Sequence, residues 1–194
     1  MILSMLNTTD AIVLSLQPHS DKAHVLHAYT RAGGRVNYMV YGLGRKNTAG
    51  KYSPLSIVQL TADKRSIRTA QLSFVPMTTV TDPYKRTIAL FISEVLYHVL
   101  RHPMPDEPMF DFIAQAIQAL DEAEEPQNFH IDFLIGLAAK LGFAIPEDDA
   151  LMAVVPHTRT ERQKKLRDLC AYFEEHVETW QDPKSLNILT EVFD

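Results

Sequence analysis

The hydrophobic pattern changes its period once, at Thr81-Asp82-Pro83, and this change constrains the fold more than any other feature of the sequence. Before it, short runs of alternating or β-branched residues are separated by turn signals, which is typical of strands. After it, apolar residues recur every three or four positions, as they do on one face of a helix. The chain is therefore predicted to form a β structure followed by a helical structure.

Five runs before the change predict strands, at residues 11–16, 23–29, 35–41, 55–61 and 66–75. Pro18 is expected to end the first strand. The Gly33-Gly34 pair predicts a hairpin between the second and third strands. Five short strands with no helix between them predict a small closed barrel, because closure removes exposed sheet edges. The five-stranded barrel with a nucleic-acid-binding face is the OB-fold.

Helical spacing predicts five helices after residue 82. Asp82 can cap the first, which begins at Pro83 and extends to about residue 101. The second carries Phe110 to Leu120, the third begins near residue 128 and stops at Gly142, the fourth follows a Thr158–Glu161 capping box, and a short terminal helix opens at Asp182-Pro183. Residues 143–157 are predicted to be irregular.

The predicted fold class is thus α+β, a β-barrel plus an all-α part. An N-terminal five-stranded OB-fold barrel at residues 1–80 would bind nucleic acid, and an α-helical domain would follow at residues 81–194. The segment between them, residues 76–82, is too short to act as a free linker. We therefore expect the two parts to pack together.

The net charge of −5 is divided unevenly along the chain. Residues 1–80 contain nine Lys and Arg against three Asp, a balance of +6. The other ten basic and twenty-one acidic residues follow, a balance of −11. This asymmetry indicates that the N-terminal part meets a polyanion and the C-terminal part does not. The alternative is that the imbalance only maintains solubility.

The stretch Gly33 to Lys51 combines a turn, a strand and a basic loop. Alternation places Val36, Tyr38 and Val40 on one strand face, which suits a core. Arg35, Asn37, Met39 and Tyr41 share the other face, where cations can neutralise phosphates and Tyr41 can stack on a base. The candidate DNA-binding residues from this stretch and the next turn are Arg35, Tyr41, Arg45, Lys46, Lys51, Lys64, Arg65 and Arg68.

No catalytic or cofactor motif is present: the sequence has no nucleophile elbow, HExxH, Walker loop or dinucleotide fingerprint. We therefore expect neither an enzyme nor a cofactor. His98 and His102, with Glu94 one turn earlier, form the best metal candidate, but no fourth ligand is evident and no metal is predicted.

Cys170 is the only cysteine, which excludes an intrachain disulfide and favours a reducing cytoplasm. The N-terminus has no basic region before its short apolar run and is not predicted to be a signal peptide. No apolar run approaches the length of a membrane span.

SDKAHVLHAYTRAGGRVNYMVYGLGRK at residues 20–46 resembles the N-terminal domain of the bacterial RecO family. That family shows a Ser-Asp/Glu-Lys stretch, a strand ending in Thr-Arg, a glycine turn, and a strand ending in Gly before a basic loop. AIVLSL (11–16) and SPLSIVQL (53–60) fit the same register, and SLNILTEVF (185–193) is similar to the family's closing helix.

The resemblance implies a DNA repair and recombination mediator that binds single- and double-stranded DNA and anneals strands. Such a protein helps to load RecA onto strands coated by the single-strand-binding protein, and its expected partner is RecR. Arg45 and Lys46, with Arg35, match the family's DNA-binding region. The resemblance also implies a bacterial cytoplasmic, nucleoid-associated location.

Many family members carry a four-cysteine zinc element, which this chain lacks, and residues 143–157 are shortened where it would lie. An apolar groove between helices, including Phe91 and Phe133, is a hypothetical site for the acidic tail of the single-strand-binding protein. Two other functions stay open: a protein-interaction scaffold that does not bind DNA, and an RNA-binding OB-fold protein.

Overall fold

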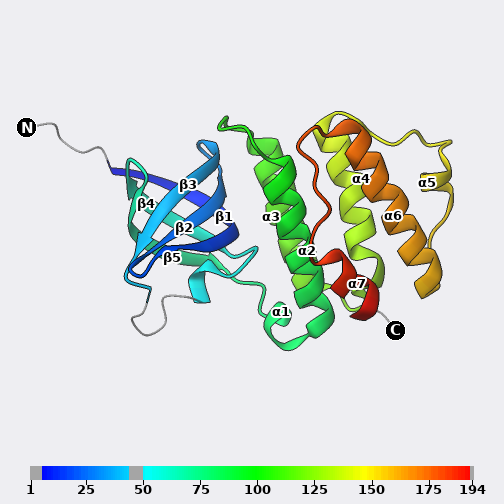
Figure 1. Ribbon diagram of the computed structural model, residues 1–194, viewed down its shortest axis with the longest axis horizontal. Coiled ribbons are helices and arrows are strands. Elements are labelled where there is room, and N and C mark those ends of the chain that lie inside the picture. The colour runs from blue at the N-terminus through cyan, green and yellow to red at the C-terminus, as the bar shows by residue number, and fades with distance from the viewer. Residues whose placement is uncertain (1–5, 44–49, 193–194) are drawn as a thin grey trace, which may run out of the picture. The chain divides into compact units, whose positions relative to one another are not determined.

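The computed structural model describes residues 6–43 and 50–192 of the 194 (Figure 1). It divides into two compact units. The first, which we name the barrel unit, comprises Met1–Met77 and Leu100–Gln118. The second, the helical unit, comprises Thr78–Val99 and Ala119–Asp194. The division of the chain into domains at residues 80 and 81 stays a prediction.

Five strands form a closed barrel in the order β1-β2-β3-β5-β4, in agreement with the predicted OB-fold. All neighbouring pairs are antiparallel except β3 and β5, which are parallel. A short 3-10 turn, η1 (Gly50–Tyr52), precedes β4. The strands are β1 (Leu6–Ser20), β2 (Ala23–Thr30), β3 (Gly34–Tyr41), β4 (Ile57–Asp63) and β5 (Ser66–Phe74).

β1 is much longer than the predicted strand, because its first half pairs with β4 and its second half with β2. The prediction that Pro18 ends this strand was wrong. The strand continues to Ser20, and a register shift between Pro18 and Ser20 interrupts the pairing there. Such an irregularity is where a strand tolerates a residue without a backbone N–H.

The alternation predicted for β3 is confirmed. Tyr38 and Val40 are buried in the barrel core, and Val36 packs against it. Asn37 and Tyr41 on the other face are exposed, and Tyr41 retains 59% of its accessible surface. The inner face of β3 therefore holds the barrel, while its outer face is available to solvent along part of its length.

Residues 100–118 belong to the barrel unit and contact the outside of the β2–β3 hairpin. Gly34, whose φ is +60°, lies so close to this segment that an added Cβ would be 2.2 Å from the Met104 carbonyl oxygen. The Arg35 backbone N–H donates to the His102 carbonyl at 3.1 Å. Further along, the ring of Phe110 in α3 (Glu107–Glu122) stacks on Tyr29 at 6.4 Å. A glycine is thus required at position 34, both for its backbone conformation and for space.

The helical unit contains most of the predicted helices at the predicted places. The Thr158–Glu161 capping box is confirmed, as is the left-handed Gly142 that ends α4. Asp82 caps α2 by accepting from the Tyr84 N–H at 2.8 Å. The elements are α1 (Thr78–Thr81), α2 (Pro83–Val99), the end of α3, η2 (Pro126–Asn128), α4 (Phe129–Leu141), α5 (Ala150–Ala153), α6 (Arg159–His176) and α7 (Leu186–Val192).

α7 begins at Leu186, later than the predicted start at Asp182-Pro183. The reason is a contact distant in sequence: the Glu94 carboxylate of α2 accepts from both the backbone N–H and the hydroxyl of Ser185, at 2.9 and 2.8 Å. Trp180, in the segment before α7, packs on Phe173 of α6 at 5.1 Å. No helix within residues 6–43 and 50–192 is both long and apolar enough to cross a lipid bilayer.

Candidate nucleic-acid interface

Three parts of the barrel meet at the C-terminal end of β3. The β1–β2 turn approaches it because Ala23 pairs with Tyr41 and the Gly42 N–H points to the Lys22 carbonyl at 3.5 Å. The β4–β5 turn approaches it because the Met39 N–H donates to the Arg65 carbonyl at 2.7 Å. We name the resulting group of Lys22, Tyr41, Lys64 and Arg65 the basic end. In OB-folds, the loops between β1 and β2 and between β4 and β5 border the ligand face of strands 2 and 3.

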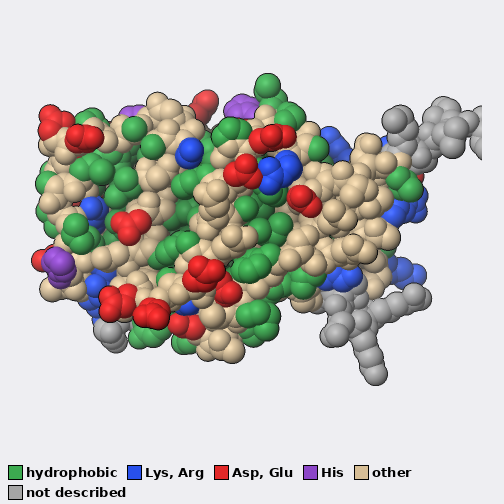
Figure 2. All heavy atoms as spheres, turned by 180° about the vertical axis from the view of Figure 1, so that it is seen from behind, with side chains coloured by type: hydrophobic (Ala, Val, Ile, Leu, Met, Phe, Trp, Pro, Cys, Tyr) green, Lys and Arg blue, Asp and Glu red, His purple; other side chains and the backbone are tan. Residues whose placement is uncertain are grey.

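The side chains of the basic end are accessible. Lys22, Lys64 and Arg65 are exposed, as is the Tyr41 ring. Lys64 has a φ of +53°, an uncommon conformation for a residue other than glycine, in a two-residue turn between Asp63 and Ser66. Figure 2 shows Lys and Arg side chains at several places on the surface of the barrel unit.

Of the other predicted binding residues that the structure describes, Arg35 lies away from the basic end, and Lys51 and Arg68 have partners within the barrel unit. Arg35 lies about 20 Å along the strand from Tyr41, six residues away. The Lys51 ammonium donates to the Ala70 carbonyl at 3.0 Å, so part of its hydrogen-bonding capacity is used within the barrel. Arg68 forms an ion pair of 3.0 Å with Asp63, which offsets its charge. Arg45 and Lys46 lie outside the described residues.

Lys22 was not among the predicted site residues. The signal was available, since Ser20-Asp21-Lys22 is the turn between the first two strands and that turn borders the ligand face of an OB-fold. Also absent from the prediction was His27 of β2, whose Nδ1 lies 2.8 Å from the Asn37 Oδ1 of β3. Counting back from a two-residue Gly33-Gly34 turn would have placed Val40 opposite His27, whereas the loop is in fact residues 31–33, with Thr30 opposite Gly34.

On the outer face of β2 and β3, two buried side chains, those of His27 and Tyr29, have shifted pKa values. Burial lowers the pKa of His27, the nearby charge of Arg35 lowers it further, and the hydrogen bond with Asn37 opposes both. Burial, with a smaller contribution from Asp106, raises the pKa of Tyr29 to about 12. Both side chains are therefore uncharged near neutral pH, and cationic groups on the face come from Arg35 and the basic end.

The metal candidate loses its geometric basis, because α2 ends at Val99 and His102 is not on the helix that carries His98. The Glu94 carboxylate already accepts a hydrogen bond from the backbone N–H of Ser185. Over the described residues, no group of three or more His, Cys, Asp and Glu side chains could hold a metal ion.

The predicted groove including Phe91 and Phe133 was wrong. Phe91 is fully buried and Phe133 is 4% exposed, so both belong to the core of the helical unit. Helical spacing identifies an apolar stripe correctly, but it does not tell whether other helices cover that stripe.

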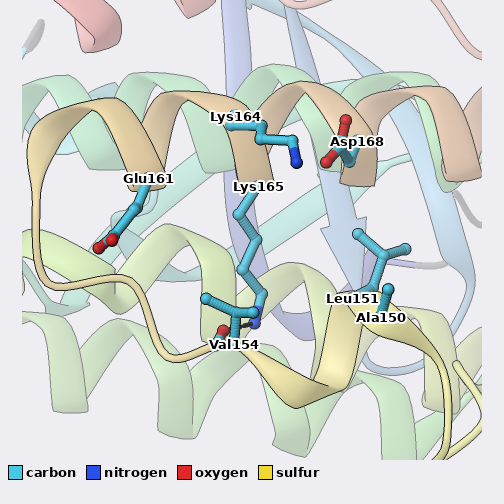
Figure 3. A pocket seen from close by; sticks show the side chains of 7 residues that line it. All are labelled: Ala150, Leu151, Val154, Glu161, Lys164, Lys165 and Asp168. Atoms are coloured by element: carbon cyan, nitrogen blue, oxygen red, sulfur yellow. Dashed lines mark hydrogen bonds between the residues drawn. The ribbon is translucent and has the colours of Figure 1, made fainter.

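A pocket of about 350 Å³ lies elsewhere in the helical unit, between α5 with its following residues and α6 (Figure 3). The Lys165 side chain extends across this pocket, and its ammonium group donates a hydrogen bond to the Val154 carbonyl at 2.5 Å. Burial lowers the pKa of Lys165, and the nearby Asp132 opposes this shift. The lining combines an aliphatic wall with charged side chains from α6, namely Ala150, Leu151, Val154, Glu161, Lys164, Lys165 and Asp168.

Comparison with known proteins gives two family matches that together cover residues 4–150. Recombination protein O N terminal matches residues 4–84, and Recombination protein O C terminal matches residues 80–150. The chain is 32% identical to DNA repair protein RecO of Porphyromonas gingivalis (strain ATCC 33277) over 164 residues, covering 78% of this chain and 66% of the relative. It is 34% identical to DNA repair protein RecO of Phocaeicola vulgatus over 149 residues, covering 71% and 61%.

The chain thus spans less than two thirds of the length of these two relatives. A third, DNA repair protein RecO of Bacteroides fragilis (strain ATCC 25285), is 28% identical over 243 residues, which cover 98% of this chain and the whole relative. Since 98% of 194 residues is about 190, roughly 50 of those 243 aligned positions have no counterpart here. With the barrel order, the helical unit and two family matches in agreement, the chain belongs to the RecO family.

Proposed function

We propose that this chain is a DNA repair and recombination mediator that binds DNA through the basic end and the outer face of β3. The observation that carries the proposal is the convergence of the β1–β2 turn, the end of β3 and the β4–β5 turn around the exposed Tyr41. Membership of a family whose relatives are named DNA repair proteins supports it.

The chemistry of the basic end suits a nucleic acid strand better than a protein surface. Lysine and arginine side chains neutralise phosphates and release counterions, while an exposed tyrosine can stack on a base whatever its identity. These groups bind and orient a strand, and they do not break bonds. The proposed role is therefore that of a binding protein and not of an enzyme, with residues 1–80 as the nucleic-acid-binding domain and residues 81–194 as the α-helical domain.

Family membership extends the proposal to activity and partners. The chain would bind single- and double-stranded DNA, anneal complementary strands and help to load RecA onto strands coated by the single-strand-binding protein, with RecR as a partner. All of these steps require contact with DNA. Loss of DNA binding is therefore the first result that would contradict them.

The decisive experiment replaces Lys64 and Arg65 with Ala and titrates a labelled single strand by fluorescence anisotropy at several salt concentrations. Affinity should fall, and the slope of log affinity against log salt should decrease in magnitude by about 1.4, because each lost single-strand phosphate contact contributes about 0.7. The matched control is Arg167→Ala with Lys184→Ala, two exposed cations of the helical unit, which should leave the slope unchanged.

Equal slopes for the two double variants would contradict the assignment of the basic end. Absence of any binding by the unaltered chain would favour the protein-interaction scaffold. Tighter binding of an RNA strand than of a DNA strand of the same sequence would favour the RNA-binding alternative.

The pocket between α5 and α6 is the proposed place for the acidic tail of the single-strand-binding protein. Its aliphatic wall suits an apolar side chain of the tail, and the Lys164 ammonium at its edge suits a carboxylate. We expect Lys164→Glu to weaken binding of a tail peptide in calorimetry roughly tenfold, since it replaces attraction by repulsion. The control Arg167→Ala should bind normally, and unchanged affinity of Lys164→Glu would exclude this pocket.

A further inference from the structure

The pair formed by His27 and Asn37 lies in the middle of the outer β2–β3 face. The two residues are directly opposite each other in the β2–β3 register, and the His27 Nδ1 is 2.8 Å from the Asn37 Oδ1. His27 is 8% exposed, while Asn37 is exposed. One partner is therefore fixed by its surroundings and holds the other at the surface.

The direction of this hydrogen bond follows from the chemistry of the two atoms. An amide oxygen can only accept, so the His27 ring must carry a proton on Nδ1 and donate it to Asn37. Burial, which lowers the pKa of His27, keeps the ring neutral near pH 7. One of the two lone pairs of the Asn37 oxygen is thus used in the ordinary state of the protein.

The two N–H bonds of the Asn37 amide remain available. Among the described residues, no hydrogen bond to its Nδ2 is seen, and the side chain is open to solvent. Asn37 held in this way acts as a hydrogen-bond donor toward a ligand and has much less capacity to accept. This differs from an unconstrained asparagine, which offers a donor and an acceptor side by side.

Asn37 also lies in a row with Met39 and Tyr41 on the outer face of β3. Alternate residues of a strand point to the same side, at a spacing of about 6.6 Å. Tyr41 at the end of the row is 59% exposed and is itself part of the basic end. A strand whose phosphates contact the basic end therefore has its bases within reach of this row.

We propose that Asn37, oriented by His27, donates a hydrogen bond to a carbonyl group on the base edge of a single strand and so favours thymine over adenine. This inference rests on the proposed function. Thymine offers carbonyl acceptors, whereas an asparagine recognises adenine by donating to N7 and accepting from N6 together. The hydrogen bond from His27 uses one lone pair of the Asn37 oxygen and turns that oxygen toward β2, away from the position in which adenine would need it.

The test compares the full chain and its Asn37→Leu variant by anisotropy with labelled oligomers of thymine, of adenine and of abasic units, equal in length. The unaltered chain should bind the thymine oligomer roughly fivefold more tightly than the adenine one, as expected for one net hydrogen bond. Asn37→Leu should lose this preference and keep the salt slope. Gln71→Leu, which removes an exposed amide from the outer face of β5, is the matched control and should retain the preference.

A second variant separates orientation by His27 from a merely local structural effect. His27→Ala frees the Asn37 oxygen, so binding of the adenine oligomer should improve relative to thymine, the opposite of a general loss. If the unaltered chain binds both oligomers but Asn37→Leu shows the same ratio, the inference is overturned and the proposed function stands. If the unaltered chain binds none of the oligomers, the proposed function itself fails.

Discussion

The barrel unit and the helical unit are stabilised in different ways. In the barrel unit, backbone ladders close the sheet, and Gly34 meets the segment at Met104 through backbone atoms alone. In the helical unit, part-buried carboxylates join distant parts of the sequence, whereas the Arg31–Asp111 ion pair of the barrel unit is exposed. The Asp121 carboxylate accepts from the backbone N–H and hydroxyl of Thr78, at 2.7 and 2.8 Å, and Glu94 accepts from Ser185, which is 91 residues away.

This difference explains where the chain can place a binding surface. The outer side chains of β3 lie outside the barrel core, so the Tyr41 ring and the N–H groups of the Asn37 amide can contact a ligand. The helical unit has less of this freedom, because several of its polar side chains are needed for folding. We therefore expect a backbone substitution to lower the free energy of unfolding most in the barrel unit. We expect a change of pH to alter stability mainly through the helical unit.

The largest expected effect is that of Gly34→Ala. The new Cβ would meet the Met104 carbonyl at 2.2 Å, and the backbone would have to keep a left-handed φ, so the free energy of unfolding should fall by roughly 2–4 kcal/mol. Urea denaturation followed by circular dichroism measures this.

Gly42→Ala is the matched control. Gly42 also has a positive φ, +73°, but an added Cβ would meet nothing within 4 Å. Gly42→Ala should lower the free energy of unfolding by only about 1 kcal/mol, which is the cost of the left-handed backbone conformation. An equal decrease in the free energy of unfolding for the two variants would show that the close contact with Met104 does not affect stability.

The second effect is a dependence of stability on pH that originates at His130. This side chain is 2% exposed and contacts Phe91 edge to face, and burial, with a smaller contribution from Arg162, lowers its pKa to about 3. Between pH 3 and 6.5 the unfolded chain therefore binds a proton that the folded chain does not. Stability from this group is complete above pH 6.5 and decreases by about 1.4 kcal/mol per pH unit below it.

Unfolding measurements at pH 7.5 and pH 5 should thus differ by about 2 kcal/mol from this residue alone. His130→Leu should reduce the difference, whatever its own stability at pH 7.5. An exposed histidine of the barrel unit, changed as His19→Leu, should leave the difference as it is. A pH dependence that is the same in all three proteins would mean that His130 is not its source.

The sequence predicted those elements whose determinants are local. The β3 alternation, the Thr158–Glu161 capping box and the left-handed Gly142 each depend on residues within a few positions. Features that depend on distant residues were missed. The length of β1 follows from pairing with two partners, and the start of α7 follows from Glu94.

The candidate site divides in the same way. Lys64, Arg65 and Tyr41 could be chosen from composition and alternation, because turns are exposed and strand faces alternate. The contacts of Lys51 with Ala70 and of Arg68 with Asp63 could not, because each depends on a partner that only the folded barrel places nearby. The role of the eight predicted residues in DNA binding stays a prediction.

Trp180 is the only tryptophan, and it packs on Phe173 within the helical unit, whereas Tyr29, Tyr38, Tyr41 and Tyr52 belong to the barrel unit. Tryptophan emission excited at long wavelength therefore monitors the helical unit alone, without any added label. Tyrosine emission includes a contribution from the barrel unit, where a stacked base would quench Tyr41. The two intrinsic signals can thus follow DNA binding and helical unfolding separately in one sample.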